Sequence, residues 1–358
     1  MRIVFLADTD QPGQSGVADY ALGLSASLRT FNVDSAVECL GPPNSSLRSS
    51  LVSRLNNLQP EWVSFQFVPY AFAHRGLVGR RSLPWQALRG RVGTHVMFHE
   101  IWIGGHQGAS LRDQAIGALQ RRGIKNVICQ IRPDMVHCSN LLYSGMLRGA
   151  GIQNRILPLF GSIPICTGGP DPYEEVLSRI DSGSRRSGWI VVALFGSIHP
   201  SENLFPALRW LQDQSLRQGK QLFLVSLGHS PTAKSTFEVL AQRFPAAGKP
   251  TFFVKGPLDS ADLSRWIHYA DCGLATTPLN IIEKSSSAVA FAEHGVPVIV
   301  LDVGADVQGV ELPRQDLDPA FWLFGDKCLY AFEGLPPRRE HQPRLDRVTK
   351  QFMAELNM

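Results

Sequence analysis

The feature that most constrains this fold is an alternation of short apolar segments with amphipathic helical segments along the chain. Residues 2–7 predict a strand, and residues 17–29 predict a helix with its apolar residues on one face. Strands separated by helices of this length form parallel sheets that carry helices on both faces. The first half of the chain is therefore expected to be a doubly wound α/β domain. Its other predicted elements are the helices 111–122 and 141–150 and the strands 62–68, 95–98, 126–131 and 135–137.

The alternation is interrupted once, by a stretch rich in proline and glycine that ends in the polar run SGSRRSG. Such a stretch is typical of a linker, and 358 residues exceed the usual size of one domain. We expect two α/β domains in tandem: 1–160, a linker at 161–188, a second domain at 189–335 and a final helical segment at 336–358. The second half is predicted to contain the strands 189–195, 221–226, 251–255, 272–275 and 296–301 and the helices 204–218, 232–244, 260–270, 284–294 and 341–358.

The composition excludes several classes of protein. Hydrophobic residues make up 44% of the chain and charged residues 18%, which is typical of a globular protein. The net charge of +4 is too small for a dedicated nucleic-acid binder, so no nucleic acid is expected as a partner. The six cysteines lie far apart, without C-x-x-C or paired histidine spacing. We therefore expect neither a metal site nor a disulfide framework.

The first residues bear on where the protein works. The apolar run at the N-terminus reaches Asp8 after too few residues for the core of a signal peptide. No run in the chain approaches the length of a membrane span. We expect a cytoplasmic protein, and the small positive charge is also compatible with peripheral contact at the inner face of a membrane.

Residues 276–300, TTPLNIIEKSSSAVAFAEHGVPVIV, contain the strongest candidate site. They predict a strand end, a polar turn with Glu283 and Lys284, and a helix that begins at three serines. The N-terminus of a helix gathers unpaired backbone N–H groups and a partial positive charge, so it attracts anions. Lys284 and the hydroxyls of Ser285, Ser286 and Ser287 therefore predict a phosphate or diphosphate ligand. The alternative is a helix that is merely capped by a serine.

Two further candidates follow strands of the first half, at the edge where doubly wound sheets bind ligands. Gly13 and Gly16 allow a tight turn that brings the backbone close to a ligand, or they form a purely structural turn. His99 and Glu100 directly follow the strand 95–98. A histidine exchanges protons near neutral pH, and a carboxylate can orient the ring or a sugar hydroxyl. Neighbouring strand residues face opposite ways, so these two need not act together.

The second half offers two more strand ends. Gly196 permits close backbone approach after the strand 189–195, and the Ser197 hydroxyl can contact a phosphate or a sugar. Gly256, Pro257 and Leu258 follow the strand 251–255 and offer backbone groups to a flat base. Each signal is weak alone. Together with the turn at Lys284, they are expected to meet at one edge of one sheet, where ligands bind.

These segments resemble a GT-B glycosyltransferase, nearest to the GT4-like group that uses nucleotide-sugar donors. The resemblance implies two Rossmann-like doubly wound domains that face each other across a cleft, with the C-terminal helix crossing back to the N-terminal domain. It covers almost the whole chain. The segments that carry it are the glycine loop 13–20, FHEIW, VHCSNLLYSGMLRGAGI, ALFGSIHPSENL, FVKGPLDSADLSRWIHYADCGLATTP and EKSSSAVAFAEHGVPVI.

The resemblance implies metal-independent transfer of a sugar, with retention, from a UDP- or GDP-linked donor. The acceptor would be a hydroxyl of a glycan, a lipid-linked saccharide or a small molecule, and no further cofactor is expected. The implied catalytic residues are His99, Glu283 and Lys284. The implied donor-binding residues are Gly16, Ser197, Gly256, Pro257, Leu258, Lys284, Ser285 and Ser286. The implied acceptor-side residues are Asp19, Glu100 and Trp102.

The chain departs from this family at two positions. Ala290 stands where the family usually has its second glutamate, which binds the ribose, and no Arg/Lys pair follows FGSI, where His199 occurs instead. Our hypothesis is that Lys284 and the serine-opened helix take over diphosphate binding. Two alternatives stay open: a nucleotide-sugar epimerase or hydrolase of the same fold, and a non-catalytic binding protein. The sequence does not identify the donor sugar, the base, the acceptor, the stereochemical course or the oligomeric state.

Overall fold

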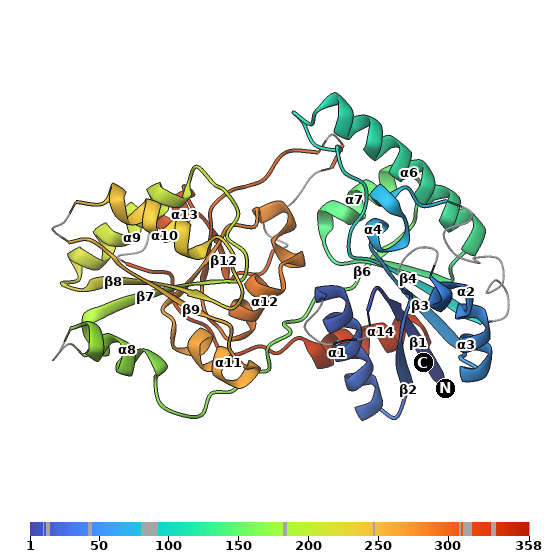
Figure 1. Ribbon diagram of the computed structural model, residues 1–358, viewed down its shortest axis with the longest axis horizontal. Coiled ribbons are helices and arrows are strands. Elements are labelled where there is room, and N and C mark those ends of the chain that lie inside the picture. Colours follow the sequence, from blue (N-terminus) through green and yellow to red (C-terminus); the bar gives the residue numbers. More distant parts are fainter. Residues whose placement is uncertain are drawn as a thin grey trace. The chain divides into compact units, whose positions relative to one another are not determined.

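The computed structural model describes the chain from residue 1 to residue 357, apart from positions 10, 12–14, 42–44, 80–91, 182–184, 246–247, 308, 311–316 and 331–333 and the side chain of residue 47. The described chain divides into two compact units (Figure 1). The first unit comprises Met1–Ser162, Ala305–Leu312 and Arg344–Met358. The second unit comprises Ile163–Gly304 and Pro313–Pro343.

In the described residues, the first unit is built around a parallel sheet with the strand order β2-β1-β3-β4-β5-β6. Its strands are β1 (Arg2–Ala7), β2 (Asp34–Cys39), β3 (Trp62–Phe67), β4 (Gly93–Phe98), β5 (Met135–Cys138) and β6 (Arg155–Ile156). Its helices are α1 (Gly16–Thr30), α2 (Ser46–Ser49), α3 (Leu51–Leu58), α4 (Pro69–Phe72), the 3₁₀ helix η1 (His74–Gly76), α6 (Leu111–Ile131), α7 (Leu141–Gly149) and α14 (Leu345–Glu355).

Both faces of this sheet are covered by helices. The central strands β1, β3 and β4 are almost wholly buried, as continuous apolar strands of parallel sheets are. One face packs against α3, α6 and α7. The other packs against α1 and α14, where Phe352 stacks on Phe5 with the ring centroids 5.9 Å apart. The expected return of the C-terminal helix to the N-terminal domain is confirmed, and Thr349 of α14 donates a hydrogen bond to Ser27 of α1.

The second unit has the strand order β12-β11-β10-β7-β8-β9 in its described residues, again all parallel. Its strands are β7 (Trp189–Phe195), β8 (Gln221–Leu227), β9 (Thr251–Gly256), β10 (Cys272–Ala275), β11 (Val298–Val300) and β12 (Phe321–Leu323). Its helices are α8 (Pro172–Ile180), η2 (Arg186–Gly188), α9 (Leu204–Arg217), α10 (Ala233–Arg243), α11 (Ser260–Tyr269), η3 (Leu279–Lys284), α12 (Ser286–Glu293) and α13 (Lys327–Tyr330). α8, α11 and α12 cover one face of the sheet, and α9 and α10 cover the other.

The segment 161–188 contains more structure than its composition suggests. Asp171 caps α8 by accepting a hydrogen bond from the backbone N–H of Tyr173 at 2.8 Å. Tyr173 and Leu177 are completely buried in the core of the second unit, and the Tyr173 hydroxyl donates to the carbonyl of Trp266 at 2.7 Å. This helix therefore belongs to the second unit and is not a free connection.

The predicted strand 126–131 is wrong, because these residues form the last turns of α6. Ile124, Val127 and Ile131 recur at helical spacing and are buried against the sheet. The helix ends at Ile131, and its C-cap Arg132 has the left-handed φ of 49°, directly before a proline. A short apolar run alone does not distinguish a buried strand from the buried face of a helix.

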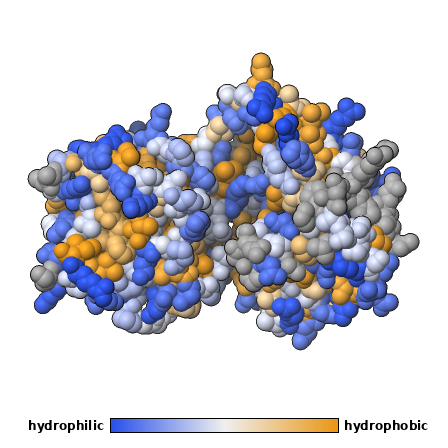
Figure 2. Space-filling model, in the orientation of Figure 1, coloured by the Kyte–Doolittle hydropathy of each residue, from blue (hydrophilic) through white to orange (hydrophobic). Residues whose placement is uncertain are grey.

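Polar residues predominate on the face of the molecule shown in Figure 2, where apolar residues occur in scattered groups. Such scattered apolar residues are ordinary for folded proteins. Among the described residues, no helix combines the length and the apolar character that crossing a bilayer requires.

Candidate functional site

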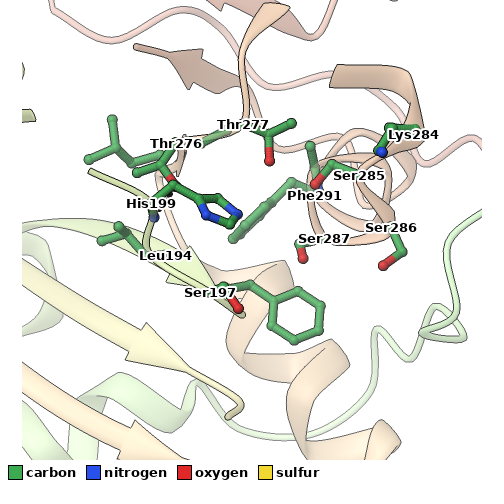
Figure 3. A pocket seen from close by; sticks show the side chains of 14 residues that line it. Leu194, Ser197, His199, Thr276, Thr277, Lys284, Ser285, Ser286, Ser287 and Phe291 are labelled. Atoms are coloured by element: carbon green, nitrogen blue, oxygen red, sulfur yellow. Dashed lines mark hydrogen bonds between the residues drawn. The ribbon is translucent and has the colours of Figure 1, made fainter. Parts of the chain in front are cut away.

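A cavity of about 230 Å³ lies in the second unit, where β7 and β10 end and α12 begins (Figure 3). Figure 3 shows Lys284 and three serines at the start of α12 on one side of the opening, with His199, Thr276 and Thr277 on the other. This is the carboxyl edge of a parallel sheet, the place where doubly wound folds bind ligands. The labelled lining residues are Leu194, Ser197, His199, Thr276, Thr277, Lys284, Ser285, Ser286, Ser287 and Phe291.

A glycine turn brings the end of β7 against the start of α12. Gly196 has a φ of +80°, which side-chain-bearing residues rarely adopt. A Cβ atom at this position would lie 3.2 Å from the Ser287 hydroxyl, so the approach is close. The backbone N–H of Gly196 donates to the carbonyl of Leu227 at 3.0 Å and fixes the turn. Gly196 therefore permits the close packing of this turn against α12, and its approach to a ligand stays a prediction.

The start of α12 is formed by a 3₁₀ turn and a serine cap. The helix begins at Ser286, two residues later than predicted, because Leu279–Lys284 form η3. Ser285 is the N-cap, and its hydroxyl accepts a hydrogen bond from the backbone N–H of Ala288 at 3.4 Å. The capping alternative therefore holds for Ser285, although this residue also lines the cavity. Ser286 and Ser287 in the first turn present two more hydroxyls there.

The loop after β7 is held by hydrogen bonds to the ends of neighbouring strands. The backbone N–H of His199 donates to the Thr276 hydroxyl at 3.0 Å, and Thr276 follows β10 directly. The Asn203 side chain donates to the carbonyl of Leu301 at 3.1 Å and to Asp302 at 2.8 Å, both after β11. These bonds place the His199 imidazole at the cavity (Figure 3).

The charge of the lining suits an anion. The side chains of Lys284 and His199 line the cavity, and its described lining includes no carboxylate. The first turn of α12 adds backbone N–H groups and the positive end of the helix dipole. Hydroxyls from six Ser and Thr residues complete a set of donors with the chemistry that phosphate oxygens require.

The structure brings some of the predicted donor residues together and separates others. Ser197, Lys284, Ser285 and Ser286 share the cavity. Glu283 lies in η3 beside them but is outside the lining. Gly256 is the last residue of β9, the edge strand, and Pro257 and Leu258 follow it; all three are also outside the lining.

Three polar lining residues are absent from the predicted set, and each has a signal in the sequence. Thr276 and Thr277 follow β10, so the strand-end rule applied to that strand identifies them. His199 lies in the loop after β7, two residues beyond Ser197. Its contribution depends on the hydrogen bond to Thr276, which joins loops distant in the sequence.

The remaining predicted donor residue, Gly16, lies in the first unit as the first residue of α1. Ser15 caps this helix by accepting from the backbone N–H of Val17 at 3.2 Å. A Cβ atom at Gly16 would meet nothing within 4 Å, so no close approach requires glycine there. Gly13 lies outside the described residues, and so does the turn in which it was expected.

The predicted acceptor-side residues all lie in the first unit. His99 follows β4, is 8% exposed, and its Nε2 atom lies 2.9 Å from Oε1 of Gln66. Its ring meets the edge of Tyr20 at a centroid distance of 5.0 Å. Burial raises the pKa of the Tyr20 hydroxyl. Glu100, the residue after His99, is half-buried.

The other two acceptor-side residues are less closely tied to His99. Asp19 is half-buried in the first turn of α1. Trp102 is half-buried after β4, and the guanidinium of Arg121 lies over its ring at 5.9 Å. The acceptor-side role of both residues remains a prediction.

Comparisons with solved structures identify the fold. No protein-family model matches the sequence, and no curated protein matches it. HepE from Anabaena, solved with UDP and glucose, superposes with a TM-score of 0.52 at 14% identity, over 98% of this chain and 90% of that one. The catalytic domain of starch synthase IV from Arabidopsis thaliana, bound to ADP and acarbose, gives 0.50 at 13% identity, over 99% and 93%.

A third similar structure has a different activity. The UDP-GlcNAc 2-epimerase from Methanocaldococcus jannaschii superposes with a TM-score of 0.51 at 10% identity, over 99% of this chain and 100% of that one. Identities this low show a shared fold and leave the reaction open. With two six-stranded parallel sheets, each flanked by helices, and neighbours of this kind, the chain has the GT-B fold.

Proposed function

We propose that this protein is a glycosyltransferase that moves a sugar from a nucleotide-diphosphate sugar to a hydroxyl of its acceptor. The observation that carries the proposal is the cavity between β7, β10 and α12, in which the Lys284 ammonium, the His199 ring and the first turn of α12 form one surface rich in hydrogen-bond donors. The similar structures solved with UDP, ADP and UDP-glucose support a nucleotide-sugar donor.

The chemistry of glycosyl transfer explains why such a cavity is useful. As the glycosidic bond to the diphosphate breaks, negative charge grows on the leaving phosphate oxygens. Donors that are already oriented toward this charge lower the barrier without reorganising during the reaction. In our proposal Lys284 supplies positive charge, and Ser286 and Ser287 supply hydroxyls and backbone N–H groups. The His199 ring adds a hydrogen bond, so that Lys284 and His199 together stand where the family has its Arg/Lys pair.

Position 290 explains how this donor site differs from the one that the resemblance implies. Ala290 is fully buried in the core of the second unit, and its carbonyl accepts from Nδ1 of His294 at 2.7 Å. A carboxylate at this position would be buried among apolar side chains, at a large free-energy cost. We propose that Glu283 contacts donor sugar hydroxyls and that Gly256–Leu258 contact the base.

The remaining parts of the proposal concern the acceptor. We place it near His99, Glu100 and Asp19 of the first unit, with Trp102 as an apolar contact. The reaction proceeds with retention, the leaving phosphate takes the acceptor proton, and neither a metal ion nor another cofactor takes part. The donor is UDP- or GDP-linked, and the acceptor is a glycan, a lipid-linked saccharide or a small molecule. The protein works in the cytoplasm, with peripheral contact at the inner face of the membrane when the acceptor is lipid-linked.

A panel of nucleotide sugars tests the proposal. A ligand that binds only the folded protein stabilises it by RT ln(1 + [L]/Kd), or about 2.7 kcal/mol at a concentration of 100 Kd. We expect one UDP- or GDP-sugar to raise the Tm and then to be consumed only when an acceptor is added. Absence of any shift across UDP-, GDP- and ADP-sugars would contradict donor binding.

Two other functions predict different results in the same assays. An epimerase or hydrolase, which the epimerase neighbour supports at the level of the fold, consumes or isomerises the donor without an acceptor. A donor-only incubation followed by chromatography of the nucleotide sugar detects this. A non-catalytic protein shows the Tm shift, but the donor stays intact with every acceptor.

A further inference from the structure

A chain of hydrogen-bonded polar side chains crosses the core of the first unit, from His99 at the end of β4 to Glu355 in the last turn of α14. Its inner members have no part in the proposed donor cavity. The links are His99 Nε2 to Gln66 Oε1 (2.9 Å), Gln66 Nε2 to Ser64 Oγ (2.7 Å), Ser64 Oγ to His95 Nδ1 (2.7 Å), His95 Nε2 to His137 Nδ1 (3.0 Å), and His137 Nε2 to a carboxylate oxygen of Glu355.

Neighbouring strands bring these side chains together on one face of the sheet. Ser64 on β3 is the register partner of His95 on β4, and His137 on β5 pairs with Met97. Ser64, Gln66, His95 and His137 are at most 1% exposed. Buried polar groups are costly unless they are hydrogen-bonded, so each member depends on its neighbours in the chain.

The hydrogen bonds run in one direction. The Gln66 amide nitrogen donates to Ser64, so its oxygen accepts from Nε2–H of His99. The Ser64 hydroxyl can then donate to Nδ1 of His95, whose Nε2–H donates to His137. A carboxylate only accepts, so the last link is a bond from Nε2–H of His137 to Glu355. In this arrangement all three histidines carry their proton on Nε2.

Burial favours the neutral form of the two inner imidazoles, which this arrangement requires. Burial lowers the pKa of His95 well below its usual value, and the neighbouring His137 and His99 lower it further. Burial also lowers the pKa of His137, although the hydrogen bond and the charge of Glu355 act in the opposite direction. With neutral rings, each link has one donor and one acceptor, so the direction at one end fixes the direction at the other.

We propose that Glu355 is a positioning residue that sets the tautomer of His99 through this chain. Glu355 holds the hydrogen-bonded chain in the direction that keeps the proton of His99 on Nε2, so that Nδ1 of this ring is an acceptor. For catalysis the inference rests on the proposed function, in which His99 serves the acceptor side. There an unprotonated Nδ1 accepts hydrogen bonds, whereas Nδ1–H only donates them.

The surroundings of Glu355 make one substitution especially informative. The Gln351 amide nitrogen donates to the carbonyl of Ile156 at 2.8 Å and to the other oxygen of Glu355 at 3.1 Å. In Glu355→Gln the new amide oxygen is expected to face Gln351, so the new amide nitrogen faces His137. That nitrogen donates, so every hydrogen bond between position 355 and His99 must reverse its direction. The Gln66 amide then turns over, and the proton of His99 moves to Nδ1.

Long-range ¹H–¹⁵N correlation spectra of protein labelled with ¹⁵N-histidine distinguish protonated from unprotonated ring nitrogens. They require neither donor nor acceptor. His99 is assigned by the signals that disappear in His99→Gln. In the wild type we expect Nε2–H at His99, His95 and His137. A proton on Nδ1 of any of the three rings in the wild type overturns the proposal, even without a variant.

In Glu355→Gln we expect the Nδ1–H form of His99 to appear. The matched control is Asp346→Asn, which makes the same chemical change at an exposed position of α14 and should leave all three rings unchanged. A Glu355→Gln protein in which His99 stays wholly Nε2–H overturns the role of Glu355. A purely structural role for Glu355 predicts that unchanged result together with a lower Tm.

A kinetic measurement adds the functional consequence. We expect Glu355→Gln to lower kcat at least about tenfold with the KM for the donor unchanged, because only the acceptor side is affected. An unchanged kcat in a variant whose tautomer has reversed overturns the catalytic part of the inference. If the wild type transfers no sugar, the proposed function fails, while the tautomer measurement still decides the role of Glu355.

Discussion

The proposed role of Lys284 gives the sharpest test of the donor site, because the prediction can be restricted to the diphosphate. In Lys284→Ala the ammonium group is lost, while the cap at Ser285 and the helix behind it are kept. A hydrogen bond to a charged group contributes about 1.5–3 kcal/mol. Since 1.4 kcal/mol is a factor of ten, we expect the Kd for UDP to rise between about tenfold and about 150-fold.

Comparison of UDP with uridine separates the phosphate contribution from that of the base. Isothermal titration calorimetry should show weaker UDP binding by Lys284→Ala and unchanged uridine binding. Lys234→Ala, at an exposed lysine on α10 of the same unit, is the control for a general change in charge. The loss should shrink as salt is added, because screening weakens the interaction between exposed charges. Equal UDP affinity in Lys284→Ala and wild type would refute this reasoning.

Two further predictions concern stability. Gly196→Ala should lower the free energy of unfolding of the second unit by about 1–2 kcal/mol, because its φ of +80° strains a residue with a Cβ atom. The control is Gly16→Ala, where a Cβ meets nothing within 4 Å and the change in urea titrations should stay within about 0.5 kcal/mol. Equal losses in the two variants would contradict the steric argument. Burial lowers the pKa of His294 to about 4, with repulsion from nearby His341, His268 and Arg338 adding to it. The folded protein takes up this proton less readily than the unfolded chain. The contribution of His294 to the free energy of unfolding is therefore fully present above pH 6.5, and about 3 kcal/mol of it is lost as the pH drops to 4. Urea titrations at pH 7 and pH 4 should show a smaller drop in His294→Gln, and parallel curves for both proteins would argue against this assignment.

The fold follows from the sequence because its signals are local. Continuous apolar strands such as β1 and β7, separated by helices, permit few arrangements other than a parallel sheet covered on both faces. The prediction fails where a short apolar run is compatible with both the strand and the helical periodicity, as at 126–131. It also fails for β2 and β12, because an edge strand buries less of its surface and carries a weaker pattern.

The site follows from the sequence only in part, because it depends on which strands become neighbours. Lys284 and Ser286 are recognisable from their position at the start of a helix. Thr276 joins them because β10 lies next to β7 in the sheet, although two strands separate these two in the sequence. Gly256 lies two strands from β7 in the opposite direction for the same reason. The strand order is a tertiary property that no short motif contains.

The hydrogen-bonded chain in the first unit shows the same limit. Ser64 and His95 stand out as polar residues inside otherwise apolar strands, which marks them as unusual. Their shared purpose emerges only when β3, β4 and β5 are adjacent and α14 covers them. A partner as distant in sequence as Glu355 has no local signal.

The position of α14 has a consequence for how the protein is made. The first unit needs Phe352 and Val348 to cover Phe5 and Met97, but the whole second unit is synthesised before that helix leaves the ribosome. Domains of nascent chains usually fold in order from the N-terminus. Here one apolar face of the first sheet stays partly uncovered, and His137 lacks Glu355, until α14 has been synthesised. We therefore expect the growing chain to expose the most apolar surface of its first sheet during synthesis of its second half.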